Sequence, residues 1–279
     1  MMPNEALPRP AATILLLRDG AAGLEVFMVV RHHAIDFAAG ALVFPGGRVE
    51  ESDHVLATHT EWCPNPDGLD VATMAFRVAA IRETFEECGV LLARQHGETG
   101  IIGASQLLAV ETAHRAALND GRIGFESILS AHDLRAAADL LVPFAHWITP
   151  ATQAKRYDTH FFLATAPEAH LAVHDGHESV DSMWIAPRQA LADTETGRFK
   201  LVFATQKNLE KLARYATVAE AMQAARAARV VTVLPQVRKL DGLRRHMRIP
   251  LEADYGGEEF VIDLPPASPA GGHKEWPSS

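Results

Sequence analysis

The sequence contains only two cysteines, Cys63 and Cys88, among 279 residues. Two cysteines cannot build the disulfide framework of a small secreted domain, and without a CxxC spacing they do not form a zinc site. The fourteen histidines are scattered, and none of them forms an HExxH motif. These absences exclude a disulfide-stapled fold and the HExxH type of metal site.

Long apolar runs are also missing, and none approaches the roughly 20 residues that a membrane-spanning helix needs. The first ten residues, MMPNEALPRP, lack the basic start and the apolar stretch of a signal peptide. The last three residues, Pro-Ser-Ser, are not a peroxisomal address. We therefore expect a cytoplasmic protein that does not engage a membrane.

Basic residues are fewer than acidic ones: the chain has 26 Lys and Arg against 35 Asp and Glu, and a formal net charge of -9. An acidic chain without a strong basic run is poorly suited to wrapping duplex DNA. We therefore expect no nucleic-acid partner. A small polyanionic molecule can still bind where a metal or a local basic pocket offsets the charge. The sequence leaves the oligomeric state open, a homodimer included.

What is present is typical of a soluble globular protein, with 48% apolar and 22% charged residues. Strands and helices alternate irregularly, which predicts an α+β fold of the α/β/α sandwich type with a mixed β-sheet. We expect one domain over residues 1–264, a loop insertion at about 54–70, a helical insertion at about 104–141, helices toward the C-terminus, and a disordered tail at 265–279. The expected strands are 11–18, 24–31, 41–44, 142–149, 157–165, 182–186, 230–234, 244–249 and 259–262, and the expected helices outside the insertion are 71–88, 187–192, 201–215 and 218–229.

The helix expected at 71–88 carries an unusual acidic cluster. Its apolar positions recur at steps of three and four, whereas Glu83, Glu86 and Glu87 fall within roughly 100° of arc on another face. Like charges at this spacing destabilise a helix and raise one another's pKa, and the C-terminal end of a helix dipole disfavours anions. A divalent cation such as Mg²⁺ or Mn²⁺ would relieve that repulsion. The alternative is a solvated acidic face on which Arg82 pairs with Glu86.

A glycine turn stands upstream of this helix. Residues 40–44 form an apolar run that leads into Pro45-Gly46-Gly47, where glycine permits close approach of the backbone to a metal or a phosphate. Together with Arg82–Val90, this turn resembles the Nudix box. The pattern of that box is Gly, five residues, Glu, seven residues, then Arg-Glu-aliphatic-x-Glu-Glu-x-Gly-aliphatic. Gly47 would be its first glycine.

The match departs from that pattern in three places. Asp53 stands at the first Glu position, Thr84 replaces an aliphatic residue, and about 21 extra residues separate Asp53 from Arg82. A loop can lengthen at small entropic cost when its ends stay close. One branch of the family has such an interrupted box, the peroxisomal coenzyme A diphosphatase of animals and its bacterial relatives. This chain resembles that branch over residues 78–92, 147–150 and 156–163.

The resemblance implies a divalent-metal-dependent hydrolase that cleaves a diphosphate linkage in coenzyme A (CoA) or acyl-CoA, giving 3′,5′-ADP and a phosphopantetheine. It implies that Glu83, Glu86 and Glu87, with the Gly47 carbonyl, hold Mg²⁺ or Mn²⁺. Arg82 would orient a glutamate, and Glu178 would supply a further carboxylate as a ligand or general base. Arg82, Glu83 and Glu178 are thus the candidate catalytic residues. The candidate phosphate contacts are Arg31, Arg48, Lys155 and Arg156, because arginine suits bidentate phosphate recognition.

Two other functions stay open. The same chemistry could act on NADH or ADP-ribose, which composition does not distinguish from CoA. A catalytically silent Nudix module that only binds a ligand is the alternative of another class. The helical segment 104–141 is expected to cap the cleft and to help select the substrate.

Overall fold

The computed structural model describes residues 6–31, 40–168, 170, 172 and 179–263. The tail expected to be disordered, 265–279, lies outside these residues. In the described part of the chain, no helix combines the length and the apolar character needed to cross a bilayer. Both cysteines are buried, and neither takes part in a disulfide bond.

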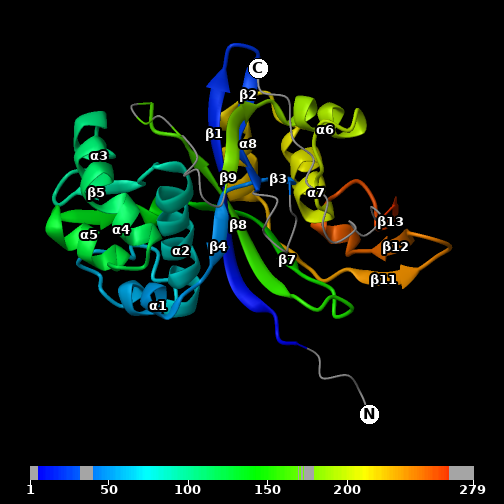
Figure 1. The fold of residues 1–279 in the computed structure, drawn as a ribbon, viewed down its shortest axis with the longest axis horizontal. Coiled ribbons are helices and arrows are strands. Elements are labelled where there is room, and N and C mark those ends of the chain that lie inside the picture. The colour runs from blue at the N-terminus through cyan, green and yellow to red at the C-terminus, as the bar shows by residue number, and fades with distance from the viewer. Residues whose placement is uncertain (1–5, 32–39, 169, 171, 173–178, 264–279) are drawn as a thin grey trace.

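An eight-stranded mixed sheet forms the centre of the molecule (Figure 1). β1 (Arg9–Gly20) and β2 (Gly23–Arg31) form the expected hairpin. β1 also pairs in parallel with β8 (Tyr157–Thr165), which brings distant parts of the sequence side by side. The strand order is β10-β7-β8-β1-β2-β3, with β4 paired to β1 and β9 paired to β2. The other strands of this sheet are β3 (Leu42–Val43), β4 (Gly46–Arg48), β7 (Val142–Ile148), β9 (Ser179–Ile185) and β10 (Thr232–Val233).

Alternation along β1 sends side chains into two separate cores. Ile14 and Leu16 pack in a core with the helix at 71–88, whereas Leu15 and Leu17 pack in a second core with the later helices. Side chains alternate between the faces of a strand, so both faces of the sheet are buried. Helices lie on both sides of the sheet (Figure 1). The predicted α/β/α sandwich is confirmed.

Helix α2 (Val71–Cys88) has the expected bounds. Asp70 caps its first turn by accepting a hydrogen bond from the Thr73 amide, and Gly89 ends it in the left-handed region with φ 69°. The expectation of one buried face was too narrow. The helix is buried on most of its circumference, because neighbouring segments pack around it, and its buried polar residues are Arg77, Arg82, Thr84 and Glu87.

The insertion before α2 is more ordered than a loop. α1 (Glu51–Ala57) occupies its beginning, so the loop expected at 54–70 starts only after Ala57. A capping box formed by Glu50 and Asp53 starts this helix, and buried Leu56 fixes it to the α2 core. The missed signal was this box, in which an acid three residues after the N-cap bonds back to the cap amide.

The segment 104–141 is largely helical, as expected, and its predicted role in selecting the substrate stays a prediction. Leu107, Val110 and Ile128 are buried in the same core as α2. Residues 118, 119 and 121–125 of the segment also line the cleft. The segment therefore both packs against α2 and contributes to the cleft wall. Its elements are α3 (Ala104–Val110), a π-helical turn (Glu111–Arg115), α4 (Ala116–Asn119), α5 (Phe125–Ala131), β6 (Leu134–Ala136), which pairs with β5 (Ala93–Gln95), and a 3-10 turn (Ala138–Leu140).

The other face of the sheet is covered by α6 (Pro187–Glu195), α7 (Phe203–Leu212) and α8 (Val218–Ala227). A small antiparallel sheet follows, made of β11 (Gln236–Lys239), β12 (Arg244–Arg248) and β13 (Glu259–Asp263). A short 3-10 turn, Leu251–Ala253, separates β12 from β13. Tyr255 links these parts: its hydroxyl accepts from Trp147 Nε1 at 2.9 Å and donates to Asn208 Oδ1 at 2.8 Å.

Candidate functional site

A cleft of about 1740 Å³ lies between α2 and α7. Its walls come from the central sheet, the first turn of α7, the α4–α5 turn and the small C-terminal sheet. Eight of the lining side chains are Lys or Arg and four are Asp or Glu. Three of those acids, Glu50, Glu83 and Glu86, lie at the α2 end. The cleft is therefore net positive in a protein whose overall charge is -9.

Arg82 is the centre of the α2 end, and its side chain is only 5% exposed. It donates from Nε and Nη2 to the two oxygens of Asp53, both at 2.9 Å, and from Nη2 to the carbonyl of Arg48 at 2.8 Å. Its Nη1 donates to Glu83 at 2.9 Å and to Glu86 at 3.2 Å. One guanidinium thus fixes α1, the end of β4 and the two glutamates of α2 relative to one another.

Asp53 has a definite place in this network, although it departs from the family pattern. It is 1% exposed and accepts from the Glu50 amide at 2.8 Å in addition to its two contacts with Arg82. Burying such a carboxylate is costly unless it is paired, and the fork of Arg82 pairs both of its oxygens. Asp53 therefore anchors Arg82 and does not line the cleft.

The glycine turn approaches α2 so closely that a side chain would not fit. A Cβ on Gly47 would clash with the carboxylate of Glu83, and a Cβ on Gly46 would clash with the backbone of β1. β4 pairs here with β1, setting Gly47 opposite Ala12. The sequence expectation that glycine permits a close backbone approach at this turn matches this geometry. The backbone of Gly47 and the carboxylate of Glu83 lie side by side.

The three glutamates of α2 have different surroundings. Glu83 and Glu86 line the cleft. Glu87 is 7% exposed, and its Oε2 accepts from the Gly46 amide at 3.0 Å, so this carboxylate holds the glycine turn. Its predicted role as a metal ligand stays a prediction.

The pKa values of Glu83 and Glu86 in this cluster are raised above their ordinary range. Burial raises the pKa of Glu83 to about 7, although Arg82 lowers it, and the charge of Glu86 raises it further. Burial likewise raises the pKa of Glu86 against the lowering effect of Arg82. For Arg82, burial lowers the pKa, but the hydrogen bond to Asp53 and the nearby carboxylates outweigh burial and raise it overall. One cation faces three acids, Asp53, Glu83 and Glu86.

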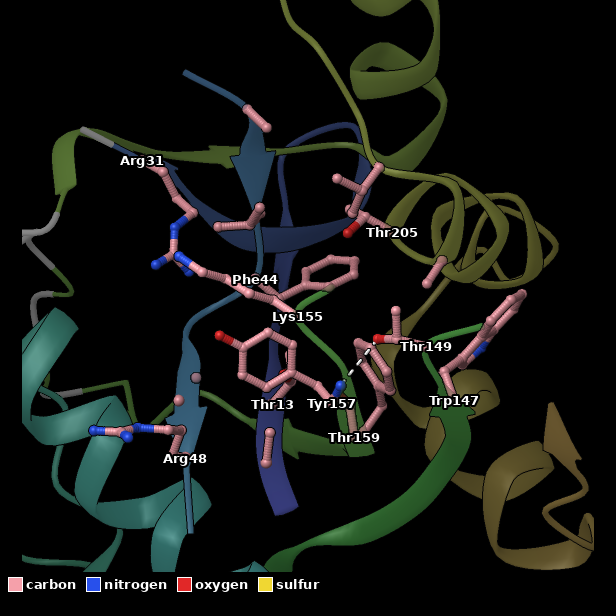
Figure 2. A pocket seen from close by; sticks show the side chains of 18 of the residues that line it. Thr13, Arg31, Phe44, Arg48, Trp147, Thr149, Lys155, Tyr157, Thr159 and Thr205 are labelled. Atoms are coloured by element: carbon pink, nitrogen blue, oxygen red, sulfur yellow. Dashed lines mark hydrogen bonds between the residues drawn. The ribbon is translucent and has the colours of Figure 1, made fainter. Parts of the chain in front are cut away.

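The predicted phosphate contacts divide into two groups. Arg31, Arg48 and Lys155 line the cleft, and Figure 2 shows the side chains of Arg31 and Lys155 extending toward one another. Arg156 does not line it. Its side chain is committed to structure, donating to the carbonyls of Thr149 at 3.1 Å and Ala6 at 2.9 Å.

Glu178, the predicted additional carboxylate, lies outside the described residues, and its role stays a prediction. Sequence reasoning missed the far wall of the cleft, where Lys200, Thr205, Lys239 and Arg245 come from α7 and the small sheet or from the segments that lead into them. No local motif marks these residues, because only the tertiary fold brings them to the glycine turn.

A second group of potential metal ligands lies outside the cleft lining. His146, Asp158 and His160 have ligand atoms within 4.8 Å of one another. The two ring nitrogens of His146 already contact Asp158 Oδ1 at 2.5 Å and Thr232 Oγ1 at 2.8 Å. Burial and the neighbouring His146 lower the pKa of His160 to about 4 despite the opposing effect of Asp158. Both ring nitrogens of His146 and one oxygen of Asp158 therefore already have partners without an ion.

A family model for the NUDT19 Nudix domain matches residues 66–202. The chain is 28% identical to the human acyl-coenzyme A diphosphatase NUDT19 over 61% of this chain and 55% of that protein. It is 26% identical to the putative nudix hydrolase 7 of Caenorhabditis elegans over 69% of this chain and 56% of that protein. The chain thus spans less than two thirds of the length of these curated relatives.

A solved structure of a NUDIX hydrolase from Alicyclobacillus acidocaldarius superimposes with a TM-score of 0.65 and 29% sequence identity, covering 78% of this chain and 96% of that chain. The overall fold is therefore shared with this solved hydrolase over most of the chain.

We expect Arg82→Lys to destabilise the protein by about 3 kcal/mol, because it leaves the buried Asp53 carboxylate without its two-point partner. Urea unfolding measures this loss. Arg94→Lys is the matched control, since Arg94 contacts both oxygens of Asp139 at a site whose side chains are 20% and 34% exposed. That change should cost less than about 1 kcal/mol. Equal losses would contradict the central role of Arg82.

We expect Glu83→Gln to stabilise the metal-free protein at pH 8. The folded-state pKa of Glu83, about 7, lies above the ordinary 4.5, so ionising it costs stability as pH rises from 4.5 through 7. Removing that charge should raise the free energy of unfolding by on the order of 2–3 kcal/mol at pH 8. The gain should vanish below pH 4.5. Unfolding in EDTA at both pH values tests this, with exposed Glu98→Gln as control, and a variant that is less stable than wild type at pH 8 would refute it.

Proposed function

Because the chain belongs to the Nudix hydrolase family, we propose that it is a divalent-metal-dependent enzyme that hydrolyses the diphosphate linkage of CoA or acyl-CoA. Water adds to one phosphorus, the bridging P–O bond breaks, and the products are 3′,5′-ADP and a phosphopantetheine or its acyl derivative. The ligand is thus a small nucleotide-type substrate.

The observation that carries this proposal is the polarity of the cleft. Glu83 and Glu86 form an acidic end beside the glycine turn, and most other charged residues of the lining are cationic. A substrate with several phosphate charges is attracted by the cationic walls. Its diphosphate can approach the carboxylates only if a cation stands between them. The cleft therefore suits a polyanion together with a metal.

The residues at the acidic end fit Mg²⁺ or Mn²⁺. Their donors are carboxylate oxygens and the adjacent backbone of Gly47, which are the hard ligands these ions prefer. Three acids share the single cation Arg82, so negative charge remains for an ion to neutralise. We propose Glu83 and Glu86 as ligands, with Glu87 and the Gly47 carbonyl as the further predicted ones. A bound divalent ion would activate water and stabilise the departing phosphate.

The chain's own groups would prepare the reaction. Arg82 holds Glu83 and Glu86 in place through Nη1, so the ligands need not reorganise when an ion binds. Arg31, Arg48 and Lys155 provide positive charge for the phosphates from the cleft walls. Glu178 is the proposed general base or additional ligand.

The choice of CoA is supported by the name shared by several relatives, acyl-coenzyme A diphosphatase. The large cleft, about 1740 Å³, is roomy enough for a long substrate. A silent ligand-binding module is disfavoured, because such a module gains nothing from keeping two partly buried carboxylates with raised pKa values side by side in the cleft.

We expect Glu86→Gln to reduce kcat at least about a hundredfold while the protein stays folded, since it removes one charged ligand and with it much of the metal's hold. Initial rates with saturating Mg²⁺ or Mn²⁺ and circular dichroism measure the two effects. Glu61→Gln, an exposed acid outside the cleft, should keep wild-type rates. Unchanged turnover by the Glu86 variant would mean that the metal lies elsewhere.

We expect CoA or acyl-CoA to be the best substrate in a panel with NADH and ADP-ribose, compared by kcat/KM. Mass spectrometry should identify 3′,5′-ADP as the product from CoA. EDTA should abolish turnover, and Mg²⁺ or Mn²⁺ should restore it. Equal or better use of NADH would overturn the CoA assignment while leaving the diphosphatase chemistry intact. No turnover of any of them, with either ion, would favour the silent module.

A further inference from the structure

The cleft has a second end, and helix α7 begins there. The first turn of this ten-residue helix lines the cleft, and its N-cap, Val202, provides no side-chain cap. The first helical hydrogen bond runs from the Gln206 amide to the Val202 carbonyl at 3.0 Å. Within the described part of the chain, the amides of Phe203, Ala204 and Thr205 find no acceptor. Three donors at the positive end of a helix dipole thus face the cleft.

Thr205 supplies a second, independent sign of a ligand. It is 4% exposed, yet among the described residues its hydroxyl has no hydrogen-bond partner. Figure 2 shows this side chain at the start of α7 with its hydroxyl oxygen directed into the cleft. Thr84, buried in α2, instead satisfies its hydroxyl on the Ala80 carbonyl at 2.6 Å. The residue is buried except where its hydroxyl opens onto the cleft, so this hydroxyl is available to bind a polar ligand there.

The charged side chains near Thr205 indicate the chemical class of this ligand. Lys200 precedes the N-cap by two residues and also lines the cleft. Of the four acids in the lining, Glu50, Glu83 and Glu86 belong to the α2 end, and the fourth, Asp263, ends β13 in the small sheet, which also contributes Lys239 and Arg245. The α7 end therefore combines amide donors, a hydroxyl and an ammonium group, which is the chemistry that binds a phosphate.

We propose that the start of α7, with Thr205 and Lys200, binds a phosphomonoester on the adenosine ribose of the substrate, namely the 3′-phosphate of CoA. This inference rests on the proposed function, in which the scissile diphosphate lies at the α2 end of the same cleft. A single bound molecule would then place its diphosphate and its separate phosphate at opposite ends. NADH and ADP-ribose carry no third phosphate, so this end of the cleft selects CoA over both.

Dephospho-CoA, which differs from CoA only by lacking the 3′-phosphate, tests the site. The wild-type enzyme should show a higher kcat/KM for CoA. Thr205→Val keeps the shape of the side chain and removes the hydroxyl, so the ratio of the two kcat/KM values should fall roughly tenfold, as expected for one hydrogen bond to a charged group. Thr205→Ser should restore most of the ratio. An equal ratio in wild type and Thr205→Val would overturn the proposal.

Binding without turnover separates this proposal from the enzymatic one. Calorimetry with the metal-free protein should show tighter binding of 3′,5′-ADP than of 5′-AMP, and Thr205→Val should narrow the difference. If neither CoA nor dephospho-CoA is cleaved but this preference holds, the hydrolase assignment fails and the phosphate site stands. If CoA is cleaved but both nucleotides bind equally, the phosphate site fails and the hydrolase assignment stands.

Discussion

The structure depends on one buried guanidinium. Arg82 binds the carboxylate of Asp53 with two parallel hydrogen bonds, and the same group reaches the Arg48 carbonyl and two glutamates. These contacts join the helix at the start of the insertion (α1), the strand at the glycine turn (β4) and the helix after the insertion (α2). This joint explains how the box tolerates about 21 additional residues: the ends of the insertion are fixed by charge and by packing, so the length between them costs little.

The same cluster around Arg82 leaves the carboxylates at the cleft in an unfavourable electrostatic environment. A buried Arg can stabilise one carboxylate well, but here it faces three, and the carboxylates closest to the cleft are the ones left with raised pKa values. The fold meets this cost through the packing of α2 on nearly all sides. Segment 104–141 contributes to that packing, and Arg115 and Asn119 also donate to the Glu86 carbonyl. Helix α2 thus combines tight packing by its neighbours with two carboxylates whose pKa values are raised.

Local sequence signals predicted the parts of the fold that local physics decides. The Asp19-Gly20 hairpin, the bounds of α2 and the left-handed cap at Gly89 follow from turn chemistry and helix periodicity. The acidic end of the cleft was predictable because Gly47, Arg82 and Glu83 stand in a recognisable order. The roles of Arg156 and Thr205 were not, since one is committed to carbonyls far away in sequence and the other lines a cleft formed by distant elements. Periodicity could not show the burial of Glu87 either, because the partner of this side chain is the Gly46 amide.

The family model ends at residue 202, the N-cap of α7, so the parts of the opposite cleft wall that α7 and β11–β13 provide lie beyond the matched region. The carboxylates at the acidic end of the cleft and most of its opposite wall thus come from different stretches of the chain. Substitutions in α7 or β11–β13 can therefore change the charge and the shape of this wall while leaving Arg82, Glu83 and Glu86 in place.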